Sequence, residues 1–242
     1  EITLRVELKP DERAMYEAIR RIAAEELSEY RGDDARFLIF AHLTRLRLAC
    51  CNAALVMPVK GANFPSAKLD AFSGIMDDLR AGGHRALVFS QFVSHLAIIR
   101  DHLDRAGIPY QYLDGSTPSG ERARRVRAFQ DNEGDAFLIS LKAGGVGLNL
   151  TAADYVIHMD PWWNPAVEEQ ASDRTHRIGQ TRPVTVYRIV ARDTIEERIV
   201  DLHSWKRGLA ESLLGDAGTP LRLSADEMMD LIKSYTGRGM TP

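Results

Sequence analysis

Gln170, Arg174 and Arg177 are spaced so that three polar side chains could act on one target. On a helix, residues at these offsets share a face, so an amide donor and two permanent cations could meet a single anion. A phosphate group is the favoured anion. The alternative is an ordinary surface helix, on which Asp173 and Arg177 form an i,i+4 pair and the other side chains are only solvated.

The local sequence predicts that these residues lie on a helix over 165–177. Asn164 is suited to the N-cap, and Pro165 fits the first helical position. Glu168 lies near the positive end of the helix dipole, and Gly179 offers a C-terminal stop.

A glycine cluster after a predicted strand is a second candidate for phosphate binding. The backbone amides of Gly144, Gly145 and Gly147 could approach a phosphate without obstruction from a Cβ atom. The cluster is not a dinucleotide fingerprint, because Leu150 occupies the position of the next glycine, and the chain has no Gly-Lys-Ser or Gly-Lys-Thr of a Walker loop. A nucleotide-dependent oxidoreductase is therefore excluded, and a tight structural turn remains the alternative.

Small donors and one lysine lie at the predicted ends of three strands: Ser90, Gln91, Ser116, Thr117 and Lys142. Such side chains are suited to hydrogen bonding with a sugar-phosphate backbone regardless of base sequence. For Ser90 and Thr117 the alternative is helix capping, because each precedes a predicted helix.

Two further groups of residues are given mainly structural interpretations. Four arginines on one predicted helix are expected to form a solvated face with only a supporting role in binding: Arg122, Arg124, Arg125 and Arg127. Trp162 and Trp163 are expected to wedge a loop against the sheet rather than to stack on a base.

Composition sets broad limits on the class of protein. The 242 residues are 45% hydrophobic, enough for a substantial core, and the net charge of -3 requires any nucleic-acid site to be a local basic patch. The two cysteines, Cys50 and Cys51, are adjacent and are expected to be free thiols in a reducing, intracellular setting. The seven histidines lack ligand spacing, so no metal site is expected, and no apolar run is long enough to span a membrane.

Alternating strand and helix patterns begin near Ser66 and predict an α/β fold. The expected strands are 86–90, 110–114, 137–140, 155–159 and 184–190, and the expected helices are 67–81, 92–106, 119–131 and 165–177. Such alternation implies right-handed crossovers and a parallel sheet covered by helices on both faces. Ligands of such sheets bind beyond the C-terminal strand ends, where the polar residues above are gathered.

The flanking segments are predicted to be mainly helical. An extended stretch covers residues 1–8, and helices are expected from Pro10 to about Tyr30 and from Asp34 to Leu55. Two capping boxes predict C-terminal helices, one starting at Thr194 with Glu197 and one at Ser224 with Glu227.

Taken in order, several motifs resemble the second lobe of Swi/Snf-like DNA translocases of helicase superfamily two. The matching segments are 87–92, 113–117, 140–151, 160–165, 170–180 and 194–199, and 43–51 resembles the connector from the first lobe. The resemblance implies a RecA-like lobe over 66–193, preceded by an extended segment and helical connector over 1–65 and followed by C-terminal helices over 194–242. The Ala- and Arg-rich composition favours a bacterial source.

The resemblance also implies roles for the candidate site residues. Arg174 and Arg177 would be arginine fingers that reach the γ-phosphate of ATP held by the first lobe, with Gln170 beside them, and Gly147 and Asn149 would line the nucleotide cleft. The residues that would contact the backbone of double-stranded DNA are Ser90, Gln91, Ser116, Lys142, Gly144 and Gly145.

Two departures from the family pattern qualify this prediction. Asn52 and Ala53 stand where many relatives have His-Pro, which leaves the path of the connector open. The Walker lysine and the magnesium-binding acidic box are absent from these residues, so ATP with Mg²⁺ would be held mainly by a first lobe of the same polypeptide. This chain alone is expected not to hydrolyse ATP.

The sequence therefore favours the second motor lobe of an ATP-dependent DNA translocase or remodeller that acts on a nucleoprotein and has no membrane partner. The expected location is the cytoplasm, with the nucleoid, in a bacterium, or the nucleus in a eukaryote. The alternative is a non-catalytic module that binds nucleic acid or protein through an inherited helicase lobe.

Overall fold

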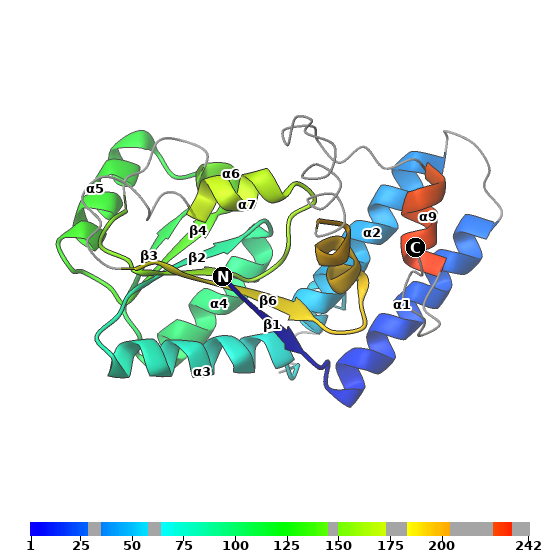
Figure 1. Ribbon diagram of the computed structural model, residues 1–242, viewed down its shortest axis with the longest axis horizontal. Helices are drawn as coiled ribbons and strands as arrows, with labels where there is room; N and C mark the ends of the chain where they lie inside the picture. Colours follow the sequence, from blue (N-terminus) through cyan, green and yellow to red (C-terminus); the bar gives the residue numbers. More distant parts are fainter. Residues whose placement is uncertain (29–34, 58–63, 145–149, 173–182, 204–224, 234–242) are drawn as a thin grey trace. The chain divides into compact units, whose positions relative to one another are not determined.

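The computed structural model describes residues 1–28, 35–57, 64–144, 150–172, 183–203 and 225–233 (Figure 1). The chain forms two compact units. One comprises Glu1–Val6 with Ser66–Val190, and the other comprises Glu7–Pro65 with Ala191–Pro242. The units combine segments that the sequence prediction kept apart: the N-terminal strand belongs with the α/β unit, and the connector belongs with the C-terminal helices.

A six-stranded sheet forms the centre of the first unit, with strand order β1-β6-β5-β2-β4-β3. The strands are β1 (Ile2–Val6), β2 (Ala86–Ser90), β3 (Tyr110–Leu113), β4 (Ala136–Ser140), β5 (Tyr155–His158) and β6 (Thr185–Ala191). β2 pairs in parallel with β4 and β5, β3 pairs in parallel with β4, and β5 with β6. The predicted parallel strands are confirmed, and β1 adds an edge strand that the pattern had suggested only as an extended segment.

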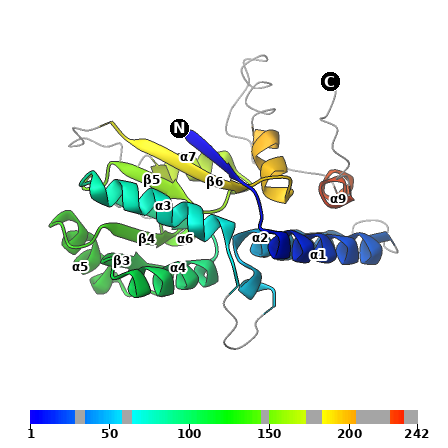
Figure 2. The same ribbon diagram turned by 90° about the horizontal axis from the view of Figure 1, so that it is seen from below.

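Helices cover both faces of this sheet, as predicted. They are α3 (Ala67–Ala81), α4 (Val93–Ala106), α5 (Ser119–Gln130), the single turn α6 (Leu141–Gly144) and α7 (Pro165–Ser172). In Figure 1, α6 and α7 lie above the sheet and α3 lies below it, and Figure 2 shows α3 and α4 in front of the strands.

The central strands supply a core to each face. Along β2, Ala86 and Val88 pack with apolar residues of α3 and α4, whereas Leu87 and Phe89 pack with those of α5 and α6. All five residues of β2 and all five of β4 are buried. This continuous burial is expected of parallel strands covered on both sides.

Local signals fix the helix ends of this unit. Ser66 caps α3 by accepting a hydrogen bond from Leu69 N, and α4 ends at Gly107 in the left-handed conformation with φ of 64°. The predicted cap of α7 is also present, because Asn164 Oδ1 accepts from Ala166 N at 3.1 Å.

The second unit contains α1 (Pro10–Ser28), α2 (Ala35–Cys51), helical residues 195–203 and α9 (Ala225–Lys233). The predicted helix to Leu55 is interrupted: α2 ends at Cys51, and Asn52 caps a separate 3-10 turn over Ala53–Leu55 by accepting from Ala54 N. Asn52 competes with the helix because its short amide bonds readily to nearby backbone.

The helix over 195–203 starts where the first capping box predicts, but its capping bonds differ from those of the box. Thr194 Oγ1 accepts from Glu196 N, and the carboxylate of Glu197 accepts from Asp193 N, so each bond is displaced by one residue from the capping-box pattern. Ser224, the first residue of the second predicted box, lies outside the described residues. None of the described helices has an apolar stretch long enough to cross a membrane.

Candidate functional site

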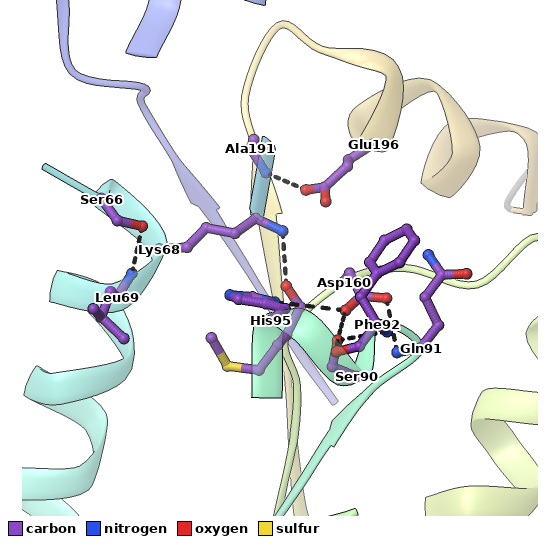
Figure 3. A network of polar contacts seen from close by, with 11 residues as sticks. Ser66, Lys68, Leu69, Ser90, Gln91, Phe92, His95, Asp160, Ala191 and Glu196 are labelled. Carbon is purple, nitrogen blue, oxygen red and sulfur yellow. Dashed lines mark hydrogen bonds and ion pairs between the residues drawn. The ribbon is translucent and has the colours of Figure 1, made fainter. Parts of the chain in front are cut away.

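The C-terminal ends of β2 and β5 bring Ser90 and Asp160 together in a buried polar network (Figure 3). The Ser90 hydroxyl donates to the Asp160 carboxylate and accepts from Phe92 N at 3.1 Å, while Gln91 N donates to Asp160 Oδ1 at 3.2 Å. Both Ser90 and Asp160 are fully buried. Asp160 therefore fixes the turn that follows β2.

This network changes the interpretation of Ser90 and Gln91. The Ser90 hydroxyl is buried inside the unit, where its hydrogen bonds hold the turn after β2. Gln91 is partly exposed at the rim, the edge of the sheet formed by the C-terminal strand ends. The alternative interpretation of Ser90 as a helix cap is wrong, because the N-cap of α4 is Phe92 and it has no side-chain cap bond.

Lys68 extends the network to α3. Its side chain is fully buried, and its Nζ atom donates to Met159 O at 2.7 Å, one residue before Asp160 (Figure 3). His95 of α4 also lies close to Asp160, with its Nδ1 atom 3.9 Å from Asp160 Oδ2. A buried cation, a buried carboxylate and a buried imidazole thus surround the end of β5, a set of residues that the sequence interpretation did not identify.

Asp114 organises a second turn, at the end of β3. Its Oδ1 accepts from Ser116 N at 2.9 Å, from Ser116 Oγ at 2.7 Å and from Thr117 Oγ1 at 3.2 Å, and its Oδ2 accepts from Tyr112 Oη at 2.7 Å. Burial opposes ionisation, but the bonds from Ser116, Tyr112 and Thr117 prevail and lower the pKa of Asp114 to about 2. Burial and the bond to Asp114 raise the pKa of Tyr112 to about 12.

The predicted DNA contacts at this second turn are only partly available. Ser116 is exposed, but its amide and its hydroxyl both donate to Asp114. Thr117 does not cap the next helix, because the N-cap of α5 is Pro118 and it has no side-chain cap bond. The capping alternative is therefore wrong for Thr117 as well.

The third strand end carries an exposed lysine. Lys142 lies on α6, immediately after β4, and Gly144 is the last residue of that turn. Arg122 of α5 supports the turn by donating to Ala143 O at 3.3 Å. Gly145, Gly147 and Asn149 lie outside the described residues.

Helix α7 follows the rim loop after β5 and presents Gln170 as an exposed residue. Arg174 and Arg177 lie outside the described residues, so their predicted roles stay predictions. Trp162, in the loop before α7, packs against the core cluster of α5 and α6, which confirms its interpretation as a wedge.

Glu168 anchors α7 to the sheet through a contact that the sequence interpretation missed. Its carboxylate is 2.8 Å from Arg188 Nε on β6 and also accepts from Trp162 N, and Glu168 is only 1% exposed. Next to this pair, burial lowers the pKa of His158, which stacks on Phe89 with ring centroids 5.6 Å apart. The available signal was Arg188 itself, because an arginine within an apolar strand pattern needs a buried partner.

Comparisons with known proteins agree with this geometry. The helicase conserved C-terminal domain family matches residues 67–179. A putative ATP-dependent helicase/translocase, YwqA of Bacillus subtilis, is 35% identical over 230 residues, which cover 93% of this chain and 25% of YwqA. A chromatin-remodeling ATPase, INO80 of Cryptococcus neoformans, is 44% identical over 161 residues, which cover 66% of this chain and 9% of INO80.

Solved structures of SWI2/SNF2 ATPases are similar to almost the whole chain. The Sulfolobus solfataricus SWI2/SNF2 ATPase C-terminal domain superposes with a TM-score of 0.77 at 27% identity and covers 97% of this chain and 98% of that one. The ATPase core from the same organism in complex with double-stranded DNA gives a TM-score of 0.79 at 29% identity, covering 97% of this chain and 50% of the core.

The parallel sheet, its two helical layers and the polar rim define a RecA-like helicase C-terminal domain. More particularly, this chain is a helicase C-terminal domain of the Swi2/Snf2-like family. It spans about a quarter of the length of YwqA.

Proposed function

We propose that this chain is the second motor lobe of an ATP-dependent translocase that moves on double-stranded DNA. The lobe supplies Arg174 and Arg177 as fingers to ATP and Mg²⁺ held by a first lobe, with Gln170 beside them. The observation that carries this proposal is the anchoring of α7: the helix starts at the C-terminal rim of the sheet, is fixed by the buried Glu168–Arg188 pair and leaves Gln170 exposed.

The chemistry of phosphoryl transfer explains why such a helix must be held firmly. The transition state spreads negative charge over the equatorial oxygens of the γ-phosphate, and a guanidinium group stabilises that charge only if it is positioned beforehand. An ion pair that is almost completely buried can hold α7, with its exposed Gln170, against the sheet.

The residues that hold the DNA backbone, called the DNA grip below, lie at the other strand ends of the sheet. Lys142 lies exposed on α6, and Gln91 is partly exposed on a turn fixed by Asp160 with its side-chain amide nitrogen buried, so an exposed cation and a partly exposed polar side chain flank the rim. Contacts of this kind position a backbone without reading its sequence. Closure of the two lobes on ATP and their opening after hydrolysis would then move the grip along the duplex.

The test uses the full-length protein, with both lobes. Wild-type protein should show ATPase activity stimulated by double-stranded DNA, and Arg174→Ala or Arg177→Ala should each lower kcat by about 10³-fold. Arg127→Ala on α5, an exposed arginine away from α7, is the matched control and should retain turnover.

The opposite outcome has a clear meaning. If both finger variants hydrolyse ATP at the wild-type rate, the finger assignment is wrong. If the full-length protein binds DNA in a salt-dependent manner but shows no stimulated ATPase, the chain is instead a non-catalytic binding module. The isolated 242-residue chain is expected to be inactive, since it lacks the Walker lysine and the magnesium-binding acids.

A further inference from the structure

A cleft of about 430 Å³ lies along the free edge of the sheet, beside β3. Its lining includes Arg100 from α4, Arg125 from α5 and the turn around Asp114. Two helices from opposite faces of the sheet therefore bring a guanidinium group each to one open edge.

Arg100 is held in place at this edge by aromatic side chains. Its guanidinium carbon lies 4.5 Å from the centroid of the Tyr112 ring, and its Nε atom donates to Tyr110 Oη at 3.4 Å. Tyr110 in turn donates to Asp104 Oδ2 at 3.2 Å. Among the described residues Arg100 forms no ion pair, so its charge is oriented by stacking while the terminal Nη groups stay available to an anion.

Arg125 is held from the other side of the strand. Its Nη1 atom donates to Tyr112 O at 2.6 Å, and its Nε atom lies 3.6 Å from Glu121 Oε2. Glu121 is engaged more closely by Arg124, through bonds of 3.1 and 2.6 Å. Because Arg125 occupies the carbonyl of Tyr112, it also obstructs the addition of a further strand at this edge.

The only carboxylate in the described lining of the cleft is already satisfied. Asp114 accepts hydrogen bonds from Tyr112, Ser116 and Thr117, so its charge is surrounded by donors. The same bonds occupy the amide and hydroxyl of Ser116, the residue at this corner that the sequence marked for DNA. The cations, not the small hydroxyls, are therefore the groups left to face a ligand.

We propose that Arg100 and Arg125 bind a phosphodiester of the duplex DNA backbone in this cleft. The inference rests on the proposed function and deepens it, because it extends the DNA grip from the rim around the free edge of the sheet. Guanidinium groups suit this ligand, since their planar array of donors matches the oxygens of a phosphate.

The test measures duplex binding by the full-length protein as a function of salt. The doubly substituted variant Arg100→Gln/Arg125→Gln should bind several-fold more weakly, and the slope of log K against log salt should fall in magnitude by about 1, because one phosphate contact is lost. The matched control is Arg80→Gln/Arg105→Gln, which removes the same charge from exposed sites on α3 and α4 outside the cleft. Its slope should stay at the wild-type value.

Two further variants separate binding from folding. Arg100→Lys/Arg125→Lys retains both charges and should keep the wild-type slope, although the geometry of the donors changes. If the doubly substituted glutamine variant does not fold, the single variant Arg100→Gln should still lower the slope relative to Arg105→Gln.

The failures of the two proposals are distinguishable. Wild-type protein that neither binds duplex DNA nor shows stimulated ATPase contradicts the proposed function. Wild-type protein that binds DNA, with equal slopes for the cleft variant and its control, overturns only the cleft assignment. A parallel titration uses polyglutamate as a probe for an acidic protein partner. If the glutamine variant of the cleft binds DNA like wild type but loses binding to polyglutamate, the cleft assignment to DNA is overturned and the cleft is assigned to an acidic protein instead.

Discussion

The carboxylate of Glu168 lies 2.8 Å from Nε of Arg188, and these two side chains are 1% and 11% exposed. The pair connects α7 to β6. Because desolvation of an unpaired ion is costly, removing either charge would leave the other buried and destabilising.

We expect Glu168→Gln to destabilise the protein by about 3 kcal/mol, because Arg188 would keep a buried charge without its counter-ion. In the full-length protein the same change should lower the kcat of the DNA-stimulated ATPase more than it alters the half-saturating DNA concentration. Urea unfolding and steady-state kinetics measure the two effects.

The control for this prediction is Glu121→Gln, which removes one member of the exposed pair with Arg124. Exposed pairs of this kind contribute little to stability, so unfolding should be nearly unchanged. Equal effects of the two substitutions on unfolding and on kcat would contradict the anchoring role of Glu168.

A second prediction concerns pH and the turn at the end of β3. The pKa of Asp114 is lowered to about 2, below its value of about 3.9 in an unfolded chain. A lowered carboxyl pKa stabilises the fold by about 2 kcal/mol above pH 4, and this contribution is lost as the pH falls from about 4 towards 2.

Asp114→Asn should therefore lower stability at neutral pH and flatten the acid limb of the stability curve. Free energies of unfolding from urea titrations between pH 2 and pH 6 provide the measurement, with Asp131→Asn, at an exposed position on the end of α5, as the control. If the steep limb below pH 4 persists in Asp114→Asn, another carboxyl group is responsible for it.

Much of the fold follows from local patterns. Helix α3 is predicted at its observed bounds, because Ser66 supplies a cap and the apolar spacing is regular. The central strands are equally clear, since continuous apolar runs in an alternating α/β pattern indicate buried parallel strands. Local sequence is sufficient where a segment and the segments packed against it belong to the same alternating pattern of strands and helices.

The sequence is less informative where partners come from distant segments. Residues 2–6 carry an extended pattern, but only the folded structure shows that they join the sheet next to β6. Likewise, Glu168 could be interpreted as a helix-dipole residue, and nothing local paired it with Arg188. Both depend on long-range packing, which period and propensity do not encode.

The predicted site shows the same division between spacing and burial. Motif order placed Ser90 and Ser116 correctly at strand ends, yet it did not indicate that Asp160 and Asp114 use their donors. Arg100 was not predicted as a site residue, because its stacking on Tyr112 joins a helix to a strand. Hydrogen-bond competition decides which polar groups remain for a ligand, and it requires the folded geometry.

The network around Asp160 yields the last prediction. Asp160→Ala removes the acceptor of both Ser90 Oγ and Gln91 N, and buried donors without partners cost about 1–3 kcal/mol each. We expect reduced stability and, in the full-length protein, a higher half-saturating DNA concentration for ATPase, because Gln91 would no longer be held at the rim.

Ser90→Ala provides the graded comparison for this variant. It removes the serine hydroxyl but leaves the Asp160 carboxylate to accept from Gln91 N, so its effect on DNA half-saturation should be clearly smaller than that of Asp160→Ala. The opposite order would show that the Ser90 hydroxyl itself carries the contact with DNA. Equal half-saturation in wild type and Asp160→Ala, at matched folding, would remove the positioning role of Asp160, because the turn after β2 would then grip DNA without its buried carboxylate.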